Sequence, residues 1–474
     1  MTGTASAGTG TSHPWFRDES RPAPSSLRTA SPAEVTALLR GELAGLSVSL
    51  PGPWVPAQPF VLPRQSYDEL FDVARTLLAL VRRAVLALDG GWPGRIEALG
   101  ADPADYPLLS GQDNTETAYC SMMARPDIVI GENGPQLLEF NVSGTFGGPN
   151  ESHGLTAVWQ RTHSERFFGH DPLLARVRAF EDVCSSRRLP RAVAIIGSLG
   201  DLQDDADVRF QEIELEQFRR RGFAADFFEP DQLPDALGRP GNLRYPLGLR
   251  NFATADWTER GQSLRPVYDA QRAGLLLLPP QSSGLLANKK ALALVSEGRP
   301  WMTRAERAVA DRHLPWTRIT LPGRTRWEGG DHDLSELLLG RQERFVLKKA
   351  IGMMGREVLV GRHTEPADWR LAVEAAFAAA DSVVQQYVEP ASCDLELTDG
   401  RAVFTAQVAP VLSPMLFGDR PGGCWARFLA DEADRSASRG VISVGGAGAA
   451  ENAVLTWADP ADAAASTRAG EAGR

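Results

Sequence analysis

The order of apolar segments between residues 190 and 285 constrains the fold of this chain more than any other feature. Ala192–Ile196 is an unbroken apolar run that ends at Gly197. A helix-like stretch, residues 210–221, and a second apolar run, Ala225–Phe228, follow it. Because two parallel strands need a long crossover between them, this order is typical of a parallel sheet. We therefore expect an α/β fold that includes a small Rossmann-like layer near residues 190–285.

A β-hairpin is predicted upstream of this layer. Asp127–Ile130 and Gln136–Phe140 are strand-like, and they flank the turn sequence Gly131-Glu132-Asn133-Gly134. Turn residues between two such runs indicate a hairpin. Three helix starts are also predicted, because a Ser or Thr followed three residues later by Glu forms a capping box. These pairs are Ser31 with Glu34, Ser66 with Glu69, and Thr303 with Glu306.

Polar side chains on the predicted hairpin form a candidate metal site. Glu139 and Asn141 are two residues apart and so point to the same face of a strand, and Asp127 lies on the partner strand. Oxygen ligands of this kind suit Mg²⁺. Arg125 points the same way as Asp127 and could meet a γ-phosphate. A hairpin with a polar outer face explains the same pattern without any ligand.

Lysine is almost absent from this chain, and where it occurs it is paired. The four lysines are Lys289–Lys290 and Lys348–Lys349, whereas the other 46 basic residues are arginine. An ammonium is a compact point charge that can reach one phosphate oxygen, whereas a guanidinium is a flat fork. The two pairs therefore predict contacts to a nucleoside triphosphate. Chance retention of four lysines is the alternative.

Glycines follow the second lysine pair. Phe345–Lys348 reads as a strand, Gly352-Met353-Met354-Gly355-Arg356 as a loop, and Glu357–Val360 as a second strand. Backbone amides of such a loop can cradle phosphates. An ordinary β-hairpin has the same pattern.

A later apolar strand is a candidate for the adenine site. Ser382–Val388 follows a predicted helix over residues 366–380, and Val403–Val408 is predicted to pair with it. The polar end of this strand could offer backbone N–H and C=O groups to adenine, and Glu389 could take ribose hydroxyls. A simple buried strand is the alternative.

Composition excludes several classes of protein. The net charge is −10 and the pI is about 5.4, which argues against a nucleic-acid partner. The four cysteines fit neither a zinc motif nor a disulfide framework, so a reducing cytosol is expected. We expect no signal peptide in the small, polar N-terminus and no membrane-spanning segment. The Walker A loop, the G-x-S-x-G elbow and the H-E-x-x-H motif are all missing from the sequence.

Taken together, these motifs resemble the ATP-grasp superfamily, and more closely its circularly permuted branch, which includes the synthetase half of glutathionylspermidine synthetase. The matching elements are, in chain order, Arg125-x-Asp127, Glu139-Phe140-Asn141, Asn288-Lys289, Val346-Leu347-Lys348 with its glycine loop, and Val384-Gln385-Gln386-Tyr387-Val388. The resemblance covers roughly residues 115–150 and 280–445. Two departures are Lys349, where the relatives have Pro, and Met353–Met354 within the loop.

The resemblance implies a circularly permuted ATP-grasp fold with a Rossmann-like layer before the nucleotide-binding part. The expected units are a disordered tail over 1–28, a helical region with the metal hairpin over 29–185, the Rossmann-like domain over 186–285, nucleotide-binding subdomains over 286–462 and a flexible tail over 463–474.

The resemblance also implies a function and a set of site residues. The protein would be a cytoplasmic ATP- and Mg²⁺-dependent carboxylate–amine ligase that forms an amide through an acylphosphate. Its substrates would be a small carboxylate and an amine of the amino-acid, short-peptide or polyamine type. A phosphotransferase on the same scaffold and a nucleotide-binding scaffold without turnover are the alternatives. The implied catalytic residues are Arg125 and Lys348. The implied nucleotide-binding residues are Lys289, Lys348, Gly352, Gly355, Arg356, Gln386, Tyr387, Val388 and Glu389. The implied metal ligands are Asp127, Glu139 and Asn141, and the implied substrate contacts are Ser143, Thr145 and Arg427.

Overall fold

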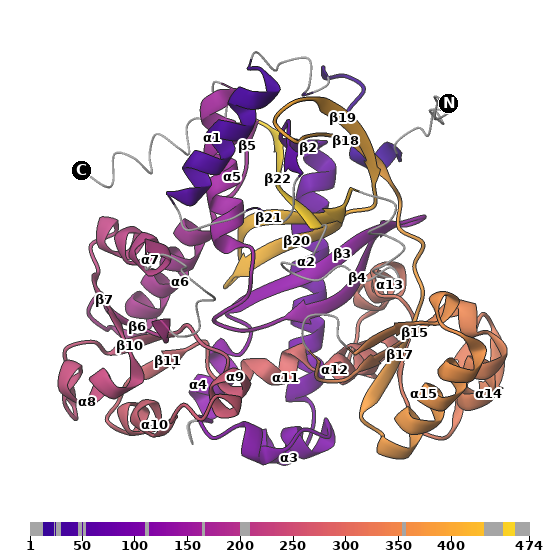
Figure 1. Ribbon diagram of the computed structural model, residues 1–474. Coiled ribbons are helices and arrows are strands. Elements are labelled where there is room, and N and C mark those ends of the chain that lie inside the picture. The colour runs from indigo at the N-terminus through magenta and orange to yellow at the C-terminus, as the bar shows by residue number, and fades with distance from the viewer. Residues whose placement is uncertain are drawn as a thin grey trace.

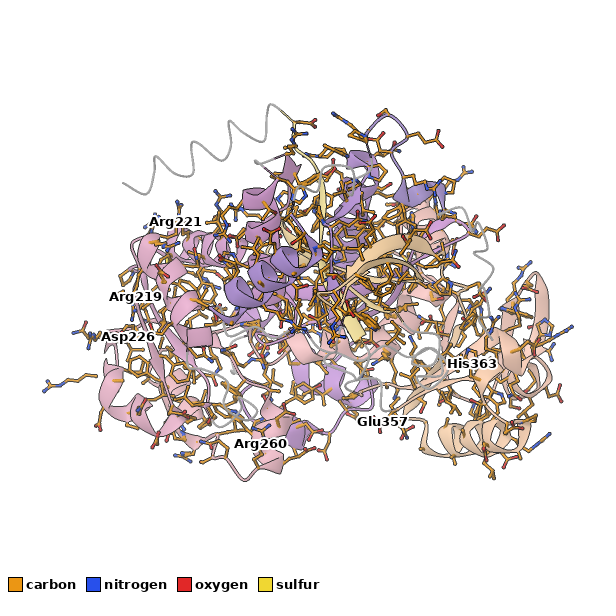
Figure 2. The ribbon with its side chains drawn as sticks, turned by 45° about the horizontal axis from the view of Figure 1, so that its top comes forward. Arg219, Arg221, Asp226, Arg260, Glu357 and His363 are labelled. Carbon is orange, nitrogen blue, oxygen red and sulfur yellow. The ribbon has the colours of Figure 1, made fainter. Side chains whose placement is uncertain are left out.

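The computed structural model describes residues 13–22, 24, 30–45, 50, 54–109, 113–163, 166–199, 209–352, 357–430 and 449–459. Within them the chain forms a mixed α/β fold in which a large central sheet lies between two smaller sheets (Figure 1). Figure 2 shows the same division from another side, with Arg219 and Asp226 on one flank of the molecule and Glu357 and His363 on the other.

The central sheet is mainly antiparallel and has the order β2-β22-β21-β20-β3-β4, with β5 paired to β22. Only β2 and β22 run parallel within it. Its strands are β2 (Phe60–Leu62), β3 (Met123–Gly131), β4 (Gly134–Asn141), β5 (Phe167–Phe168), β20 (Val411–Phe417), β21 (Arg420–Leu429) and β22 (Ala449–Trp457).

Helices cover both faces of the central sheet. The amphipathic helix α2 packs its apolar side, including Leu70 and Leu77, against Ile128 and Leu412 on one face. On the other face, α6 packs against Met415 and Phe417. The helices of this part are α1 (Pro32–Ala44), α2 (Arg64–Leu86), α3 (Gly91–Ala98), α4 (Asp113–Tyr119), α5 (Pro149–Thr162) and α6 (Pro172–Arg187).

The predicted parallel layer is present beside the central sheet. Its order is β11-β10-β6-β7, and all its strands run parallel. The elements are β6 (Ala192–Ile196), α7 (Arg209–Arg220), β7 (Ala224–Phe228), α8 (Leu233–Ala236), the ribbon β8 (Gly238–Arg239) with β9 (Asn242–Leu243), β10 (Leu247–Arg250), α9 (Thr254–Glu259), α10 (Arg265–Arg272) and β11 (Leu276–Leu278).

The third sheet is antiparallel, with the order β12-β17-β15-β16, and α14 and α15 cover one of its faces. Its elements are α11 (Ser283–Ala287), α12 (Lys289–Glu297), α13 (Arg304–His313), β12 (Thr317–Ile319), the ribbon β13 (Arg324–Trp327) with β14 (Gly330–Asp333), α14 (Leu334–Gly340), β15 (Phe345–Lys349), β16 (Val358–Val360), α15 (Pro366–Ala379) and β17 (Ser382–Gln386). A separate three-stranded sheet consists of β1 (Val55–Pro56), β18 (Cys393–Thr398) and β19 (Val403–Val408). Short 3-10 turns lie at Pro14–Phe16, Pro103–Asp105, Pro230–Gln232, Gln342–Arg344 and Gly361–His363.

Two local predictions are wrong. Val403–Val408 does not pair with the 382–388 strand but with Cys393–Thr398, because β12 and β15 already occupy both edges of β17. Ser66 does not cap a helix, because α2 begins at Arg64, immediately after Pro63. The Ser66 hydroxyl donates instead to the Trp15 carbonyl. The capping boxes at Ser31 and Thr303 are confirmed.

None of the helices in the described part of the chain is both long and apolar enough to cross a bilayer.

Candidate functional site

The predicted hairpin brings together the residues of the candidate metal site. Strands β3 and β4 are antiparallel, with Asp127 opposite Glu139 and Arg125 opposite Asn141. Side chains that lie directly opposite each other project from the same face of a sheet. Gly134 permits the tight turn because its backbone has a φ of +94°, which residues with a Cβ rarely adopt.

The two predicted lysine sites meet at this hairpin, although about sixty residues separate them in the sequence. The Lys289 ammonium lies 3.3 Å from the Glu139 carboxylate. The Lys348 ammonium donates to the Leu138 carbonyl at 3.3 Å and to the Gln385 side chain at 2.7 Å. The first turn of α12 also docks on the end of β15, since the Lys289 N–H donates to the Ala350 carbonyl.

Burial sets the charge state of Lys348. It lowers the pKa of the ammonium to about 8, and the positive charge of Lys289 acts in the same direction while Glu139 opposes it. Two ammonium groups held this close to one carboxylate leave the site short of negative charge. A phosphate chain would supply that charge.

The Asp127 carboxylate forms ion pairs with two arginines, so neither of its oxygens is free to bind a metal. Its carboxylate lies 2.9 Å from Arg427 and 3.4 Å from Arg125, and it accepts a hydrogen bond from Ser413 at 2.9 Å. Burial alone would raise the pKa of this carboxyl, but Arg427 and Arg125 hold it at about 2. Asp127 is therefore ionised and already partnered.

The oxygen atoms of Glu139, Asn141 and Asp127 suit Mg²⁺ chemically, but they differ in how free they are to bind it. Glu139 is about a quarter exposed and pairs with a lysine, and the Asn141 oxygen is the third candidate ligand. Both Asp127 oxygens have partners, so one would have to leave for that residue to bind a metal. Within the described ranges no group of three His, Cys, Asp or Glu residues is placed to hold a metal ion. A magnesium site here would rest on two carboxylates and one amide, and Mg²⁺ typically keeps several waters in such sites.

The expected adenine residues begin next to Gln385, the side-chain partner of Lys348 at the end of β17. Residues 386–389 line a cavity of about 790 Å³ between the hairpin turn and the third sheet. Glu389 forms an ion pair with Arg362, whose guanidinium lies 3.8 Å above the Tyr387 ring. Neither Lys289 nor Lys348 is among the described residues that line this cavity. The structure thus joins the lysines to the metal hairpin but does not place the adenine residues in the same cavity.

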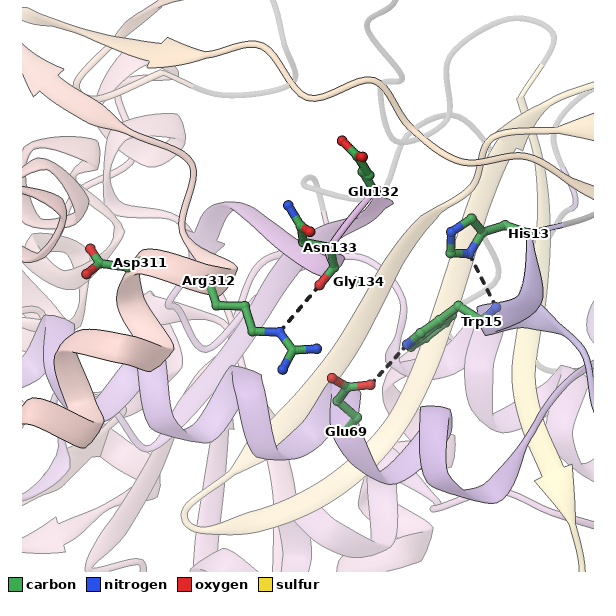
Figure 3. A pocket seen from close by; sticks show the side chains of 8 residues that line it. All are labelled: His13, Trp15, Glu69, Glu132, Asn133, Gly134, Asp311 and Arg312. Carbon is green, nitrogen blue, oxygen red and sulfur yellow. Dashed lines mark hydrogen bonds between the residues drawn. The ribbon is translucent and has the colours of Figure 1, made fainter. Parts of the chain in front are cut away.

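A smaller hollow of about 470 Å³ lies at the same hairpin turn (Figure 3). Arg312 reaches across it and donates to the Asn133 carbonyl at 3.5 Å, while Glu69 accepts from the Trp15 indole on the opposite side. It shares Glu132 and Asn133 with the larger cavity. None of the predicted site residues lines it.

Of the remaining predicted residues, one contacts the lysine site, two lie outside the described residues, and two lie between β4 and α5. Gly352 lies at the site, since its carbonyl accepts from the Lys289 ammonium at 3.5 Å. Gly355 and Arg356, together with Met353–Met354, lie outside the described residues. Ser143 and Thr145 occupy the segment between β4 and α5, where the Ser143 hydroxyl accepts from the Thr145 N–H at 3.3 Å.

Two polar residues beside the site, Ser413 and Glu451, were not predicted. The polar face of the central sheet carries a row that crosses five strands, and we call it the polar row: Glu139, Asp127, Ser413, Arg427 and Glu451. Arg427 was expected to bind substrate and Asp127 to bind metal, but the ion pair between them was not predicted. Sequence alternation along β21 and β22 was the available signal for this row, but neither strand had been recognised.

Comparison with known proteins supports the fold alone. The sequence matches no protein-family profile and no curated protein. Among solved structures, the chain is similar to a glutathione synthetase-like effector from Globodera pallida in its apo form. That likeness has a TM-score of 0.55 and 10% identity, and it covers 93% of this chain and 100% of the other. A candidate gamma-glutamylcysteine synthetase from Methylobacillus flagellatus KT gives a TM-score of 0.37 at 13% identity over 78% of this chain and 85% of the other, which is too weak to carry an argument. The chain thus shares its overall fold with a glutathione synthetase-like protein.

Proposed function

We propose that the protein is an ATP- and Mg²⁺-dependent carboxylate–amine ligase of the circularly permuted ATP-grasp type. The observation that carries this proposal is the meeting of Lys289 and Lys348 at Glu139. Three residues from three separate elements converge there, in a chain whose lysines are confined to the pairs Lys289–Lys290 and Lys348–Lys349. The fold likeness to a glutathione synthetase-like protein supports the same reading.

In this proposal the two ammonium groups bind the phosphates of ATP, and Arg125 stabilises the γ-phosphoryl group during transfer. Glu139 and Asn141, with Asp127 after release of one oxygen, would hold Mg²⁺. The metal would neutralise charge on the transferred group when bound. Phosphoryl transfer needs little covalent chemistry from the protein, so positioning and charge are its main tasks.

The polar row gives the second half of the reaction a location. The substrate carboxylate must lie within reach of the γ-phosphoryl group, and the row leads from Glu139 along the sheet to Glu451. An amine held along this row could attack the acylphosphate carbon and displace phosphate. The segment from Ser143 to Gly148 lies over the row, because the Gly147 carbonyl accepts from Arg125 at 2.8 Å.

The test is ADP release screened against pooled carboxylates and amines, with mass spectrometry of the products. We expect ADP, phosphate and a product whose mass is that of acid plus amine minus water. A phosphorylated product would indicate a phosphotransferase instead. Nucleotide binding without turnover on any pool would favour a non-catalytic scaffold.

A further inference from the structure

The larger cavity, beside the third sheet, has walls that the proposed phosphate chemistry does not use. Besides residues 386–389, its lining includes the end of α12, the helix α13, the start of β12 and the β13–β14 ribbon. Its volume of about 790 Å³ falls in the range of sites for small organic molecules. Among the described residues, Lys289, Lys348 and Gln385 do not line it. The cavity is therefore a space separate from the lysine site.

Arg318 on β12 is a fixed cation in the wall of this cavity. Its guanidinium lies 4.6 Å from the centre of the Trp316 ring. Its Nε donates to the Thr325 hydroxyl at 3.1 Å, and one Nη donates to the Ser296 hydroxyl at 3.2 Å and to the Thr317 carbonyl at 2.7 Å. All three acceptors are uncharged, and no carboxylate in the described part of the chain pairs with Arg318. The guanidinium is thus held in position while its charge is left without a counter-ion.

The charged groups nearest to Arg318 do not remove this imbalance. Burial lowers the pKa of Arg318, and Glu297 at the end of α12 opposes this shift, whereas Arg307 from α13 adds to it. The Glu297 carboxylate already pairs with Arg299 at 3.4 Å. Arg307 lines the same cavity as Arg318. An anion bound in the cavity would therefore lower the repulsion between two guanidinium groups.

Aromatic side chains lie beside this cation in the cavity wall. Trp316 is half-buried, and Trp327 is 6% exposed. The indole N–H of Trp327 has no hydrogen-bond partner among the described residues. Leu314 and Pro315 extend the apolar part of the lining. A cation next to flat apolar surfaces favours a ligand that joins an anionic group to a ring.

We propose that this cavity binds a small aromatic molecule that carries a phosphate or a carboxylate. The anionic group binds Arg318, and the ring packs against Trp316 and Trp327. A guanidinium can donate two parallel hydrogen bonds to either kind of oxyanion, so the two share one recognition chemistry. The inference goes beyond the proposed ligase function, which uses none of these three side chains.

The experiment measures binding of phenyl phosphate and benzoate by calorimetry, with inorganic phosphate and acetate as probes that lack the ring. We expect at least one aromatic probe to bind at least about tenfold more tightly than its ring-free counterpart, and the stronger of the two identifies the oxyanion. Arg318→Gln should weaken that binding by at least about tenfold, on the scale of one charge-assisted hydrogen bond. Arg370→Gln, at an exposed position of α15, is the matched control and should bind like the wild type.

Two further variants keep the test decisive. Arg307→Gln should weaken binding in the same direction, and it replaces Arg318→Gln if unfolding measurements show that the latter does not fold. Lys348→Met should bind the aromatic probe like the wild type, because Lys348 does not line the cavity.

The inference is overturned if neither aromatic probe binds better than its ring-free counterpart, or if the folded arginine variants bind as well as the wild type. Loss of binding in Lys348→Met would also overturn it, because the probe would then occupy the lysine site. Mg²⁺-ATP binding is measured separately on the wild type and on Arg318→Gln, and both should bind. Its absence from the wild type would contradict the ligase proposal and leave the aromatic anion site standing.

Discussion

Replacement of Lys348 by Met should make the protein more stable at neutral pH, and this gain should fade as the pH rises. Lys348 is buried, and its pKa is lowered from 10.5 to about 8 because burial disfavours the charged form. Below pH 8 the folded protein must keep a charge that the unfolded chain solvates freely. The cost of that charge is on the order of 3 kcal/mol at pH 7, since one pKa unit corresponds to about 1.4 kcal/mol.

The sign follows from proton linkage. Between pH 8 and pH 10.5 the unfolded chain binds more protons at this residue than the folded protein does, so the stability of the wild type rises with pH in this window. The Met variant lacks this titrating group, so its stability does not rise with pH in this window. Its advantage over the wild type should therefore shrink by roughly 2–3 kcal/mol between pH 7 and pH 10.

The assay is urea unfolding of both proteins at pH 7 and pH 10. Lys349→Met is the matched control, because the neighbouring Lys349 side chain is 40% exposed and pairs with Asp381. We expect little change in its stability relative to the wild type at either pH. A stability difference between wild type and Lys348→Met that stays constant from pH 7 to pH 10 would refute the reasoning. It would mean that the ammonium is solvated and not held in a buried site.

Three further predictions follow from the same contacts. Lys348→Arg should reduce ADP formation by roughly 10²-fold, on the scale of one preorganised donor, whereas Lys349→Arg should have a milder effect; equal tolerance at both positions would remove the phosphate role of Lys348. Asp127→Asn should lower the free energy of unfolding by about 3 kcal/mol, because it leaves Arg427 and Arg125 without their shared carboxylate. In the wild type this stabilisation should be lost as the pH falls from 3.8 through 2. A variant that is as stable in urea as the wild type would contradict the pairing. Gly144→Ala should lower the unfolding temperature strongly, because the added Cβ would lie 1.8 Å from the Arg250 carbonyl oxygen. Gly340→Ala is the control and should be tolerated, because its Cβ would meet nothing within 4 Å. Similar unfolding temperatures for the two variants would show that the 142–148 segment packs differently.

Local sequence signals predicted the elements whose information lies within a few residues. The β3–β4 hairpin was predicted because a glycine-containing turn separates two strand-like runs, and β6, α7 and β7 because one apolar run follows another across a helical stretch. The start of α2 was misplaced because two signals competed over three residues. Pro63 ends the preceding strand and lets the helix begin before Ser66.

Contacts between distant segments were predicted only where chemistry linked them. The hypothesis that two lysine pairs serve one ligand agrees with the meeting of Lys289 and Lys348 at Glu139. The bond from Arg427 to Asp127 spans three hundred residues and depends on the order of strands in the central sheet, which no local pattern encodes. The pairing of β19 failed for the same reason. Strand propensity indicates that a strand exists, but not which edge it joins.

The central claim is that Glu139, Lys289 and Lys348 form a Mg²⁺-ATP site, and it is tested most directly by calorimetry with non-hydrolysable ATP. The wild type should bind the nucleotide tightly only when Mg²⁺ is present. Glu139→Gln keeps the shape of the side chain but removes its charge, so it should lose the Mg²⁺-dependent part of the affinity while still unfolding in one cooperative transition. Glu374→Gln, at an exposed position of α15, should behave like the wild type. Equal Mg²⁺-dependent affinity in wild type and Glu139→Gln would contradict the account.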